Sequence, residues 1–294
     1  MPPTRVFLLT SLAMIAFAGN SLLCRLALKN TDIDAASFTS IRLFSGALVL
    51  FLLVWLKNRR TPAPENLQGN WLSGLALFSY AAGFSFAYDS LTAATGALLL
   101  FSAVQATMIG HGLWSGERFF ARQIIGLLFA FAGLLLLLLP GISAPPIFSS
   151  LLMLSAGVAW GIYSLRGKNT QNAIAASAGN FLRSLPFTLV LSVLLLSRMS
   201  LDSSGVAYAL GSGALASGLG YVIWYVVLPE LKSTTAATVQ LSVPAIAAIG
   251  GILLLGEALN LRLAIAAMAI LGGIAMVILW KTRASQTDQN ARSS

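Results

Sequence analysis

The residues of this sequence best able to do chemistry are polar side chains set at the ends of, or inside, long apolar stretches. Polar and ionisable groups are costly in hydrocarbon, so within a membrane span they are the default candidates for solute binding. The same residue types also hydrogen-bond one span to the next. No Asp or Glu occurs in the middle of any stretch, and the chain has no Walker A motif and no metal-ligand cluster. The pattern therefore predicts solute binding without a cofactor or a metal.

The candidate substrate-binding residues are amide, hydroxyl and aromatic side chains deep in the apolar stretches. An amide offers both a donor and an acceptor, which suits the zwitterionic head of an amino acid. Tyr and Trp offer apolar faces with a polar tip. Each candidate has a packing alternative. We predict a cavity lined by Asn20, Tyr80, Phe84, Ser102, Gln105, Trp160, Tyr163, Tyr221 and Gln240.

Two arginines lie inside apolar stretches, Arg42 and Arg183. A guanidinium taken out of water needs a carboxylate or several carbonyls as partners. Each arginine could pin a helix end or loop, with Asp34, Asp89 or Asp202 as a partner, or could bind the carboxylate of a substrate. The symmetric placement of the pair toward opposite membrane faces favours gating or anchoring.

Four further residues have gating, structural or proton-handling interpretations. Glu117 and Glu257 each end an apolar stretch before basic residues, which favours helix capping or a gate pair. Pro244 frees backbone carbonyls in mid-helix and is grouped with them. His111 is the only histidine and a possible proton site near neutral pH, although a lone His near a helix end is more typical of packing.

Composition identifies the elements that must position these residues. The chain of 294 residues is 57% apolar and only 9% charged, whereas a soluble domain carries roughly 25% charged residues. Apolar runs of about 20 residues, enough to span the bilayer, recur along its whole length. We expect an all-α integral membrane protein with ten transmembrane helices. Their expected ranges are Val6–Leu28, Ala35–Leu56, Trp71–Tyr88, Thr92–Trp114, Ala121–Leu139, Ile147–Leu165, Ala176–Leu196, Gly205–Val227, Thr234–Leu255 and Leu263–Trp280.

An internal repeat divides these helices into two halves. The segment Thr95–Gly133 aligns without a gap on Thr235–Gly273, and both copies contain a Gly-Glu pair followed by an Arg. We assign residues 1–140 to a first five-helix repeat, 141–281 to a second, and 282–294 to a disordered cytoplasmic tail. Because five is odd, the second half enters the membrane inverted. Inverted repeats are typical of secondary transporters that work by alternating access.

The charges predict how the chain is oriented in the membrane, and they bear on whether it carries a cleavable leader or binds nucleic acid. Most of the 18 Lys and Arg residues fall on the side of the N-terminus, so both termini should be cytoplasmic in a multi-pass inner (plasma) membrane protein. Arg5 and the following apolar run could pass for a cleavable leader, but Ala18-Gly19 has a counterpart in Trp160-Gly161, which favours a permanent span. The net charge of +9 lies in short loops and does not form a nucleic-acid-binding face.

Together these features resemble a known family. Ten spans in two halves, an Arg in the second span of each half, Trp160-Gly161 and the duplicated Gly-Glu pairs are similar to the drug/metabolite transporter superfamily, in particular its EamA-type permeases. The resemblance implies a ten-helix exporter of small metabolites, often amino acids, aromatic ones included. One departure is that Val104 occupies the place of Pro244 in the first half.

The function expected from the sequence is export of amino acids, with large apolar or aromatic ones the best candidates, by alternating access. The missing mid-span carboxylates favour uniporter-like transport. A proton-coupled multidrug or metabolite exporter, an integral-membrane enzyme acting on lipid-linked substrates, and a channel are the alternatives. We expect no enzymatic activity, a small-molecule substrate, the lipid bilayer as environment, no nucleic-acid partner, and a monomer or weak homo-oligomer.

Overall fold

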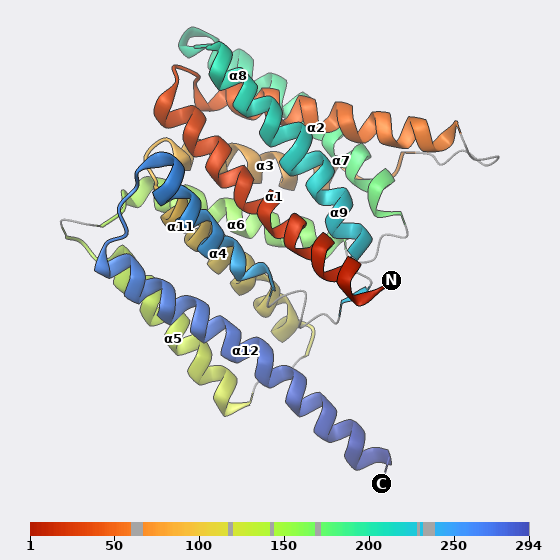
Figure 1. Ribbon diagram of the computed structural model, residues 1–294, viewed down its shortest axis with the longest axis vertical. Helices are drawn as coiled ribbons and strands as arrows, with labels where there is room; N and C mark the ends of the chain where they lie inside the picture. Colours follow the sequence, from red (N-terminus) through yellow and green to blue (C-terminus); the bar gives the residue numbers. More distant parts are fainter. Residues whose placement is uncertain are drawn as a thin grey trace.

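The computed structural model describes residues 1–59, 67–116, 120–141, 144–167, 172–227, 230–231 and 239–293. These residues form helices and connecting turns with no strand (Figure 1). The helices are α1 (Pro3–Asn30), α2 (Ala35–Asn58), α3 (Trp71–Tyr88), α4 (Ala93–Trp114), α5 (Ala121–Leu138), α6 (Ile147–Gly167), α7 (Ala173–Leu194), η1 (Leu196–Arg198), α8 (Ser203–Leu210), η2 (Gly211–Leu219), α9 (Gly220–Val227), α11 (Ser242–Leu255) and α12 (Leu261–Ser293).

The helices follow the ten expected ranges closely. The segments α8, η2 and α9 are continuous and together form the eighth range. Among the described residues, eight helices are long and apolar enough to cross a membrane, with α8, η2 and α9 counted as one, and α11 is a shorter apolar helix. The all-α integral membrane fold is thereby confirmed. At the C-terminal end the structure continues α12 to Ser293, through the residues that the sequence assigns to a disordered tail.

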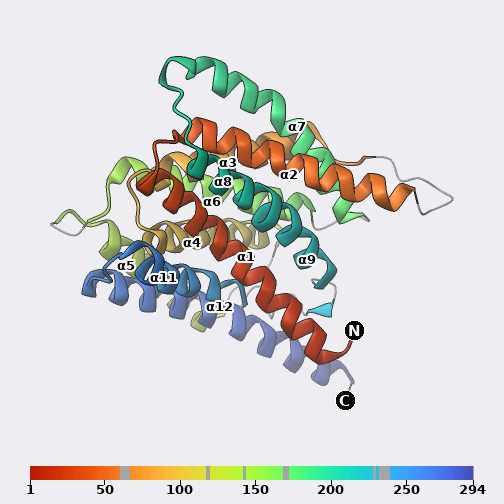
Figure 2. The ribbon, with the colours of Figure 1, turned by 45° about the horizontal axis from the view of Figure 1, so that its top comes forward.

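The helices form a central group with one peripheral pair. The pair α5 and α12 lies along one side, and α2 and α7 lie together on the other (Figures 1 and 2). Between them α3 and α4 pack on α6, while α1 packs on α8, η2, α9 and α11. Small residues allow the closest approaches: a Cβ added at Gly126 of α5 would lie 2.6 Å from the Gly273 carbonyl oxygen of α12. Such contacts drive helix association in a bilayer, where burial of apolar surface adds little.

Polar side chains next to the helix ends satisfy the free backbone donors there. Asp34 accepts hydrogen bonds from the Ala36 and Ser37 amides, and Asp202 accepts one from the Gly205 amide. Burial opposes ionisation of Asp34, but its hydrogen bonds, including one from the Ser200 amide, outweigh burial and hold the pKa of its carboxyl below the ordinary value. These aspartates are therefore occupied as helix caps.

The Gly-Glu pair of the second half, Gly256-Glu257, forms the turn that ends α11. Gly256 follows the end of α11 with φ of +62°, a left-handed conformation that glycine adopts without strain. The Glu257 amide then turns back to donate to the Gly251 carbonyl oxygen at 3.0 Å. This turn stops the helix and directs the Glu257 side chain toward the bundle. Glu117, its counterpart, lies outside the described residues.

Candidate functional site

The centre of the bundle holds a completely buried arginine. Arg42, on α2, is 1% exposed. Its Nη2 donates to the Tyr80 hydroxyl at 2.9 Å, and its Nε donates to the Ser217 hydroxyl at 3.3 Å. The guanidinium lies over the rings of Tyr80 and Phe84, 5.1 and 4.8 Å from their centroids. Its buried Nη1 has no hydrogen-bond partner among the described residues.

A π-helical segment builds the polar surface beside Arg42. In a π-helix, residues five apart share a face, so η2 directs both Ser212 and Ser217 at α1. The Asn20 Oδ1 accepts hydrogen bonds from Ser212 at 2.9 Å and from Ser217 at 3.2 Å. Ser217 thus connects Asn20 to Arg42 in one buried network. The sequence predicted one apolar helix over Gly205–Val227 and gave no sign of this π-helical geometry.

Aromatic rings enclose this network. Trp160 on α6 lies 4.8 Å from the Tyr80 ring and 5.0 Å from the Tyr221 ring, measured between centroids. Tyr163 stacks on Trp160 at 5.5 Å. The Tyr80 ring lies 5.5 Å from that of Phe84. The structure therefore brings six of the nine predicted binding residues, together with Arg42, into one cluster; they are Asn20, Tyr80, Phe84, Trp160, Tyr163 and Tyr221.

The other three predicted binding residues differ in their surroundings. Gln105, on α4, is 3% exposed, and its Nε2 has no hydrogen-bond partner among the described residues. Ser102 is half-buried and donates to the Leu98 carbonyl oxygen of its own helix at 2.6 Å. Gln240 is half-buried just before α11. Of the remaining candidates, Pro244 is buried in α11, and His111 is exposed near the end of α4.

The two arginines of the repeats prove to be different. Arg183 is half-buried, and its Nη1 donates to the Gln68 and Gly179 carbonyl oxygens at 3.1 and 2.9 Å. The first of these bonds connects α7 to the segment before α3, and the anchoring role stays a prediction. Pairing of Arg42 with Asp34, Asp89 or Asp202 is not what the structure shows, because Asp34 and Asp202 cap helices and Asp89 contributes its backbone carbonyl to Arg25.

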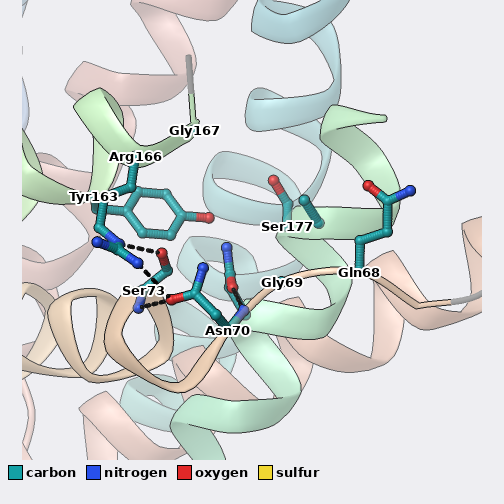
Figure 3. A pocket seen from close by; sticks show the side chains of 10 residues that line it. Gln68, Gly69, Asn70, Ser73, Tyr163, Arg166, Gly167 and Ser177 are labelled. Atoms are coloured by element: carbon teal, nitrogen blue, oxygen red, sulfur yellow. Dashed lines mark hydrogen bonds between the residues drawn. The ribbon is translucent and has the colours of Figure 1, made fainter. Parts of the chain in front are cut away.

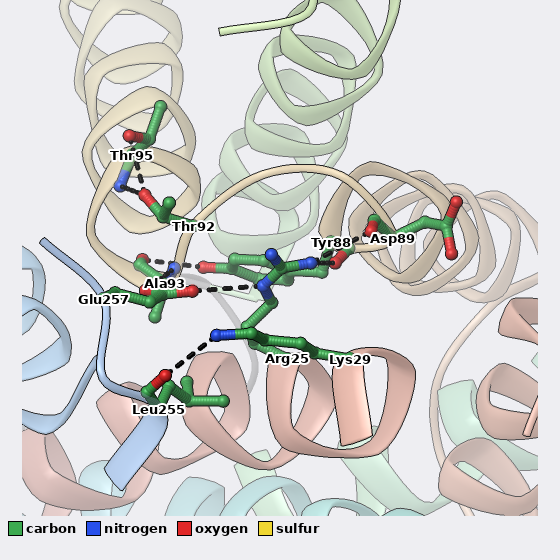
Figure 4. A network of polar contacts seen from close by, with 9 residues as sticks. All are labelled: Arg25, Lys29, Tyr88, Asp89, Thr92, Ala93, Thr95, Leu255 and Glu257. Atoms are coloured by element: carbon green, nitrogen blue, oxygen red, sulfur yellow. Dashed lines mark hydrogen bonds and ion pairs between the residues drawn. The ribbon is translucent and has the colours of Figure 1, made fainter. Parts of the chain in front are cut away.

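A buried ion pair joins four helix ends at one end of the bundle, which we call the Glu257 end (Figure 4). Arg25 Nε donates to Glu257 Oε1 at 3.1 Å, and Arg25 Nη1 donates to the Tyr88 and Asp89 carbonyl oxygens at the end of α3. Glu257 Oε2 accepts from the Ala93 amide at the start of α4, at 2.8 Å. A cation at a helix C-terminus and an anion at an N-terminus both oppose the helix dipole favourably.

Arg25 is not among the site residues predicted from the sequence. Its place near the end of the first apolar stretch is typical of a loop charge. The ion pair with Glu257, and the nearby hydrogen bond from Lys29 to the Leu255 carbonyl oxygen at 2.8 Å, connect α1 to the end of α11. Charge complementarity to Glu257 was the available signal, but nothing in the sequence brings two residues so distant along the chain together.

At the opposite end, which we call the Arg166 end, a cavity of about 130 Å³ opens between α3, α6 and α7. Arg166 Nε donates to the Ser73 hydroxyl and its Nη2 to Asn70 Oδ1, both at 3.1 Å. The Tyr163 ring lies between Arg166 and Ser177 (Figure 3). None of the described residues lining the cavity is acidic; they are Gln68, Gly69, Asn70, Ser73, Tyr163, Arg166, Gly167, Ala176, Ser177 and Asn180.

A bundle of long apolar helices around buried polar residues defines a multi-pass membrane protein. The model of the EamA-like transporter family matches the chain twice, at residues 4–139 and 147–279. The chain belongs to this family. The expected superfamily membership is confirmed, and the coarse prediction of a transporter with it.

Relatives and a solved structure agree with this assignment. An uncharacterized protein of Pseudomonas aeruginosa is 56% identical over 95% of this chain and 96% of its own length. An uncharacterized transporter of Archaeoglobus fulgidus is 27% identical over 92% of this chain and 96% of its own. A crystal structure that is 18% identical superposes with a TM-score of 0.63 over 92% of this chain and 99% of that one, which shows a shared fold.

Proposed function

We propose that this protein is a secondary transporter that exports amino acids, best large apolar or aromatic ones, by alternating access. Arg42 binds the substrate carboxylate in this mechanism. The observation that carries the proposal is the environment of Arg42: a fully buried guanidinium with no carboxylate partner in the described part of the chain and with Nη1 unpartnered.

A buried charge without an opposite charge is costly, and pairing offsets the cost. Two neutral hydroxyls and two ring faces compensate Arg42 only in part. A carboxylate bound to the planar guanidinium would supply a charge-assisted, bidentate partner. The sequence alone favoured a gating or anchoring role for Arg42; we propose carboxylate binding instead because of its buried environment.

The surrounding groups suit the rest of an amino acid. Asn20 Oδ1, which now accepts from Ser212 and Ser217, can accept from a substrate ammonium group. The rings of Tyr80, Trp160 and Tyr221 supply apolar surface for a large side chain. These rings contact one another directly, so substrate binding requires them to separate. Binding therefore selects a conformation other than this one.

The packing of the helices supports two inverted halves. The pairs α2–α7, α4–α11 and α5–α12 each join equivalent helices of the two repeats, and α3 packs on α6 as the eighth helix packs on α1. A two-fold axis in the membrane plane would produce these pairings. The Glu257 end is closed by its ion pair, while the Arg166 end has a cavity. With cytoplasmic termini in the inner membrane, the cavity would face the cytoplasm, the side from which an exporter loads.

Transport by liposomes containing the purified protein tests this proposal. Uptake of radiolabelled Trp and Phe is compared with uptake of Thr and Ala, with and without a proton gradient. We expect selective, gradient-independent uptake that Trp160→Ala abolishes. Arg42→Gln should also abolish it, whereas Arg183→Gln should retain it, because the hydrogen bonds of Arg183 to described residues go to backbone carbonyls away from the central cluster.

Two further comparisons address the carboxylate and the coupling. Tryptamine lacks the carboxylate of Trp, so it should fail to compete with Trp for uptake. Uptake that requires a proton gradient and is lost in His111→Gln would instead support the proton-coupled alternative. If folded wild-type protein takes up no amino acid, the substrate assignment is wrong.

A further inference from the structure

We propose that the cavity at the Arg166 end is a second binding site, at which the carboxylate of the substrate binds to Arg166 before it reaches Arg42. This inference rests on the proposed function and adds a site that shares only Tyr163 with the sequence-predicted binding residues and with the central cluster. The chemical class it takes is a small carboxylate, here the head group of an amino acid.

The first support is the charge of the cavity wall. Arg166 is held in place by hydrogen bonds to Ser73 and Asn70, which fix its guanidinium at the cavity. Within the described residues no acid lies within salt-bridge distance of it. The helices α3 and α7 begin at the cavity and α6 ends there, so two positive helix ends oppose one negative end. The cavity thus has an excess of positive charge.

The second support is the set of hydrogen-bonding groups. Ser177 and Asn180 are 3% and 7% exposed, yet both line the cavity. The hydroxyl of Tyr163 is directed to the same side as Ser177 (Figure 3). Hydroxyl and amide groups bind a carboxylate oxygen by donation and an ammonium by acceptance. A cavity of about 130 Å³ accommodates a head group, while a large side chain would extend outward.

The third support is the connection to the centre. Tyr163 lines the cavity and stacks on Trp160, with ring centroids 5.5 Å apart and planes 29° apart. Trp160 in turn contacts Tyr80, whose hydroxyl binds Arg42. Along this chain of contacts, the stacked rings of Tyr163 and Trp160 separate the two arginine sites. Movement of Tyr163 and Trp160 would pass the carboxylate from Arg166 to Arg42.

Thiol labelling measures the charge preference of the cavity without any transport assay. Ser177→Cys is introduced into a Cys24→Ser background, because Cys24 is the natural chain's one cysteine. The reaction rates of the new thiol with an anionic sulfonatoethyl and a cationic trimethylammonioethyl methanethiosulfonate are each divided by the rates with free cysteine. We expect a preference for the anionic reagent on the order of tenfold, as one partly screened charge at short range would give.

Matched variants assign that preference to Arg166. Arg166→Gln should reduce it to about twofold or less, while Arg122→Gln, which removes an arginine at the start of α5, should leave it unchanged. Phe should slow the labelling of the thiol introduced by Ser177→Cys, and phenylalaninamide, which lacks the carboxylate, should not. Equal relative rates for the two reagents, or a preference that survives Arg166→Gln, would overturn the proposal.

The two proposals fail separately. A wild-type protein that transports amino acids, together with a Ser177→Cys variant whose thiol shows no anion preference, disproves the Arg166 site and leaves the proposed function standing. Anion preference and protection by Phe in a protein that transports no amino acid support the Arg166 site as a carboxylate-binding site and disprove the proposed function.

Discussion

Arg25 and Glu257, 232 residues apart in the sequence, form a buried ion pair with 3.1 Å between Nε and Oε1. Their side chains are only 12% and 7% exposed. Each partner also binds backbone at a helix end, so the pair links α1, α3, α4 and the turn after α11. Separation of these elements at the Glu257 end therefore breaks bonds of this ion pair.

We predict that Glu257→Gln opens this end. The substitution keeps the shape but removes the charge that binds Arg25 and the start of α4. Loss of about 1.4 kcal/mol from the closed state raises the open population about tenfold. Ser21→Cys, one helical turn deeper than Arg25 and at a position that is 1% exposed, reports the change by faster labelling in the Cys24→Ser background.

The control for this experiment is Glu230→Gln. Glu230 pairs with the N-terminal amine at an exposed position, where an ion pair contributes little. Its substitution should leave the labelling of the Ser21→Cys thiol unchanged. Equal labelling with Glu257 intact and with Glu257→Gln would show that the ion pair does not hold this end closed.

The serines of η2 should differ in their importance for transport. Ser217 binds both Arg42 and Asn20, whereas among the described residues the Ser212 hydroxyl donates to Asn20 alone. Loss of one buried hydrogen bond costs about 1 kcal/mol, or roughly fivefold in affinity. We expect Ser217→Ala to raise the half-saturating concentration of Trp several-fold and Ser212→Ala to raise it less. The reverse order would exclude Arg42 as the carboxylate-binding group.

Replacing Gln105 with an apolar residue should stabilise the protein. Its Nε2 is buried without a partner in the described structure, and such a group costs about 1–3 kcal/mol. Gln105→Leu should therefore raise the melting temperature in detergent and reduce transport if Gln105 meets substrate. Gln123→Leu is the control with the opposite sign, because Gln123 donates to the Val277 carbonyl oxygen and accepts from the Phe120 amide. Destabilisation by Gln105→Leu would show that its amide is satisfied.

Gly213 is a position where any side chain should disrupt packing. A Cβ there would collide with the Ser45 hydroxyl and the Arg42 carbonyl oxygen of α2. Since backbone cannot move aside as a flexible side chain can, Gly213→Ala should lower the yield of monodisperse protein on size-exclusion chromatography. Gly272→Ala, whose added Cβ meets no atom within 4 Å, should leave the yield unchanged. A normal yield for Gly213→Ala would mean that α2 and η2 are farther apart than the structure places them.

The sequence by itself determined the helices. A bilayer requires about 20 apolar residues per span and internally satisfied backbone, so hydropathy fixes both the kind of element and its limits. The ranges agree with the observed helices to within a few residues, apart from the extension of α12 and from Thr234–Leu255, whose first residues lie outside the described chain. The cost of polar groups in hydrocarbon likewise identified Asn20, Tyr80 and Tyr221 as candidates, and the structure gathers them at one place.

Only the tertiary structure decided what each polar residue contacts. Arg42 and Arg183 each lie in the second helix of a predicted repeat, yet Arg42 is buried among aromatic rings while Arg183 binds one carbonyl before α3 and one of its own helix. The partnership of Arg25 with Glu257 and the face shared by Ser212 and Ser217 also depend on packing. Hydropathy measures the transfer of a residue from water to lipid, and that quantity carries no information about which distant helix satisfies its hydrogen bonds.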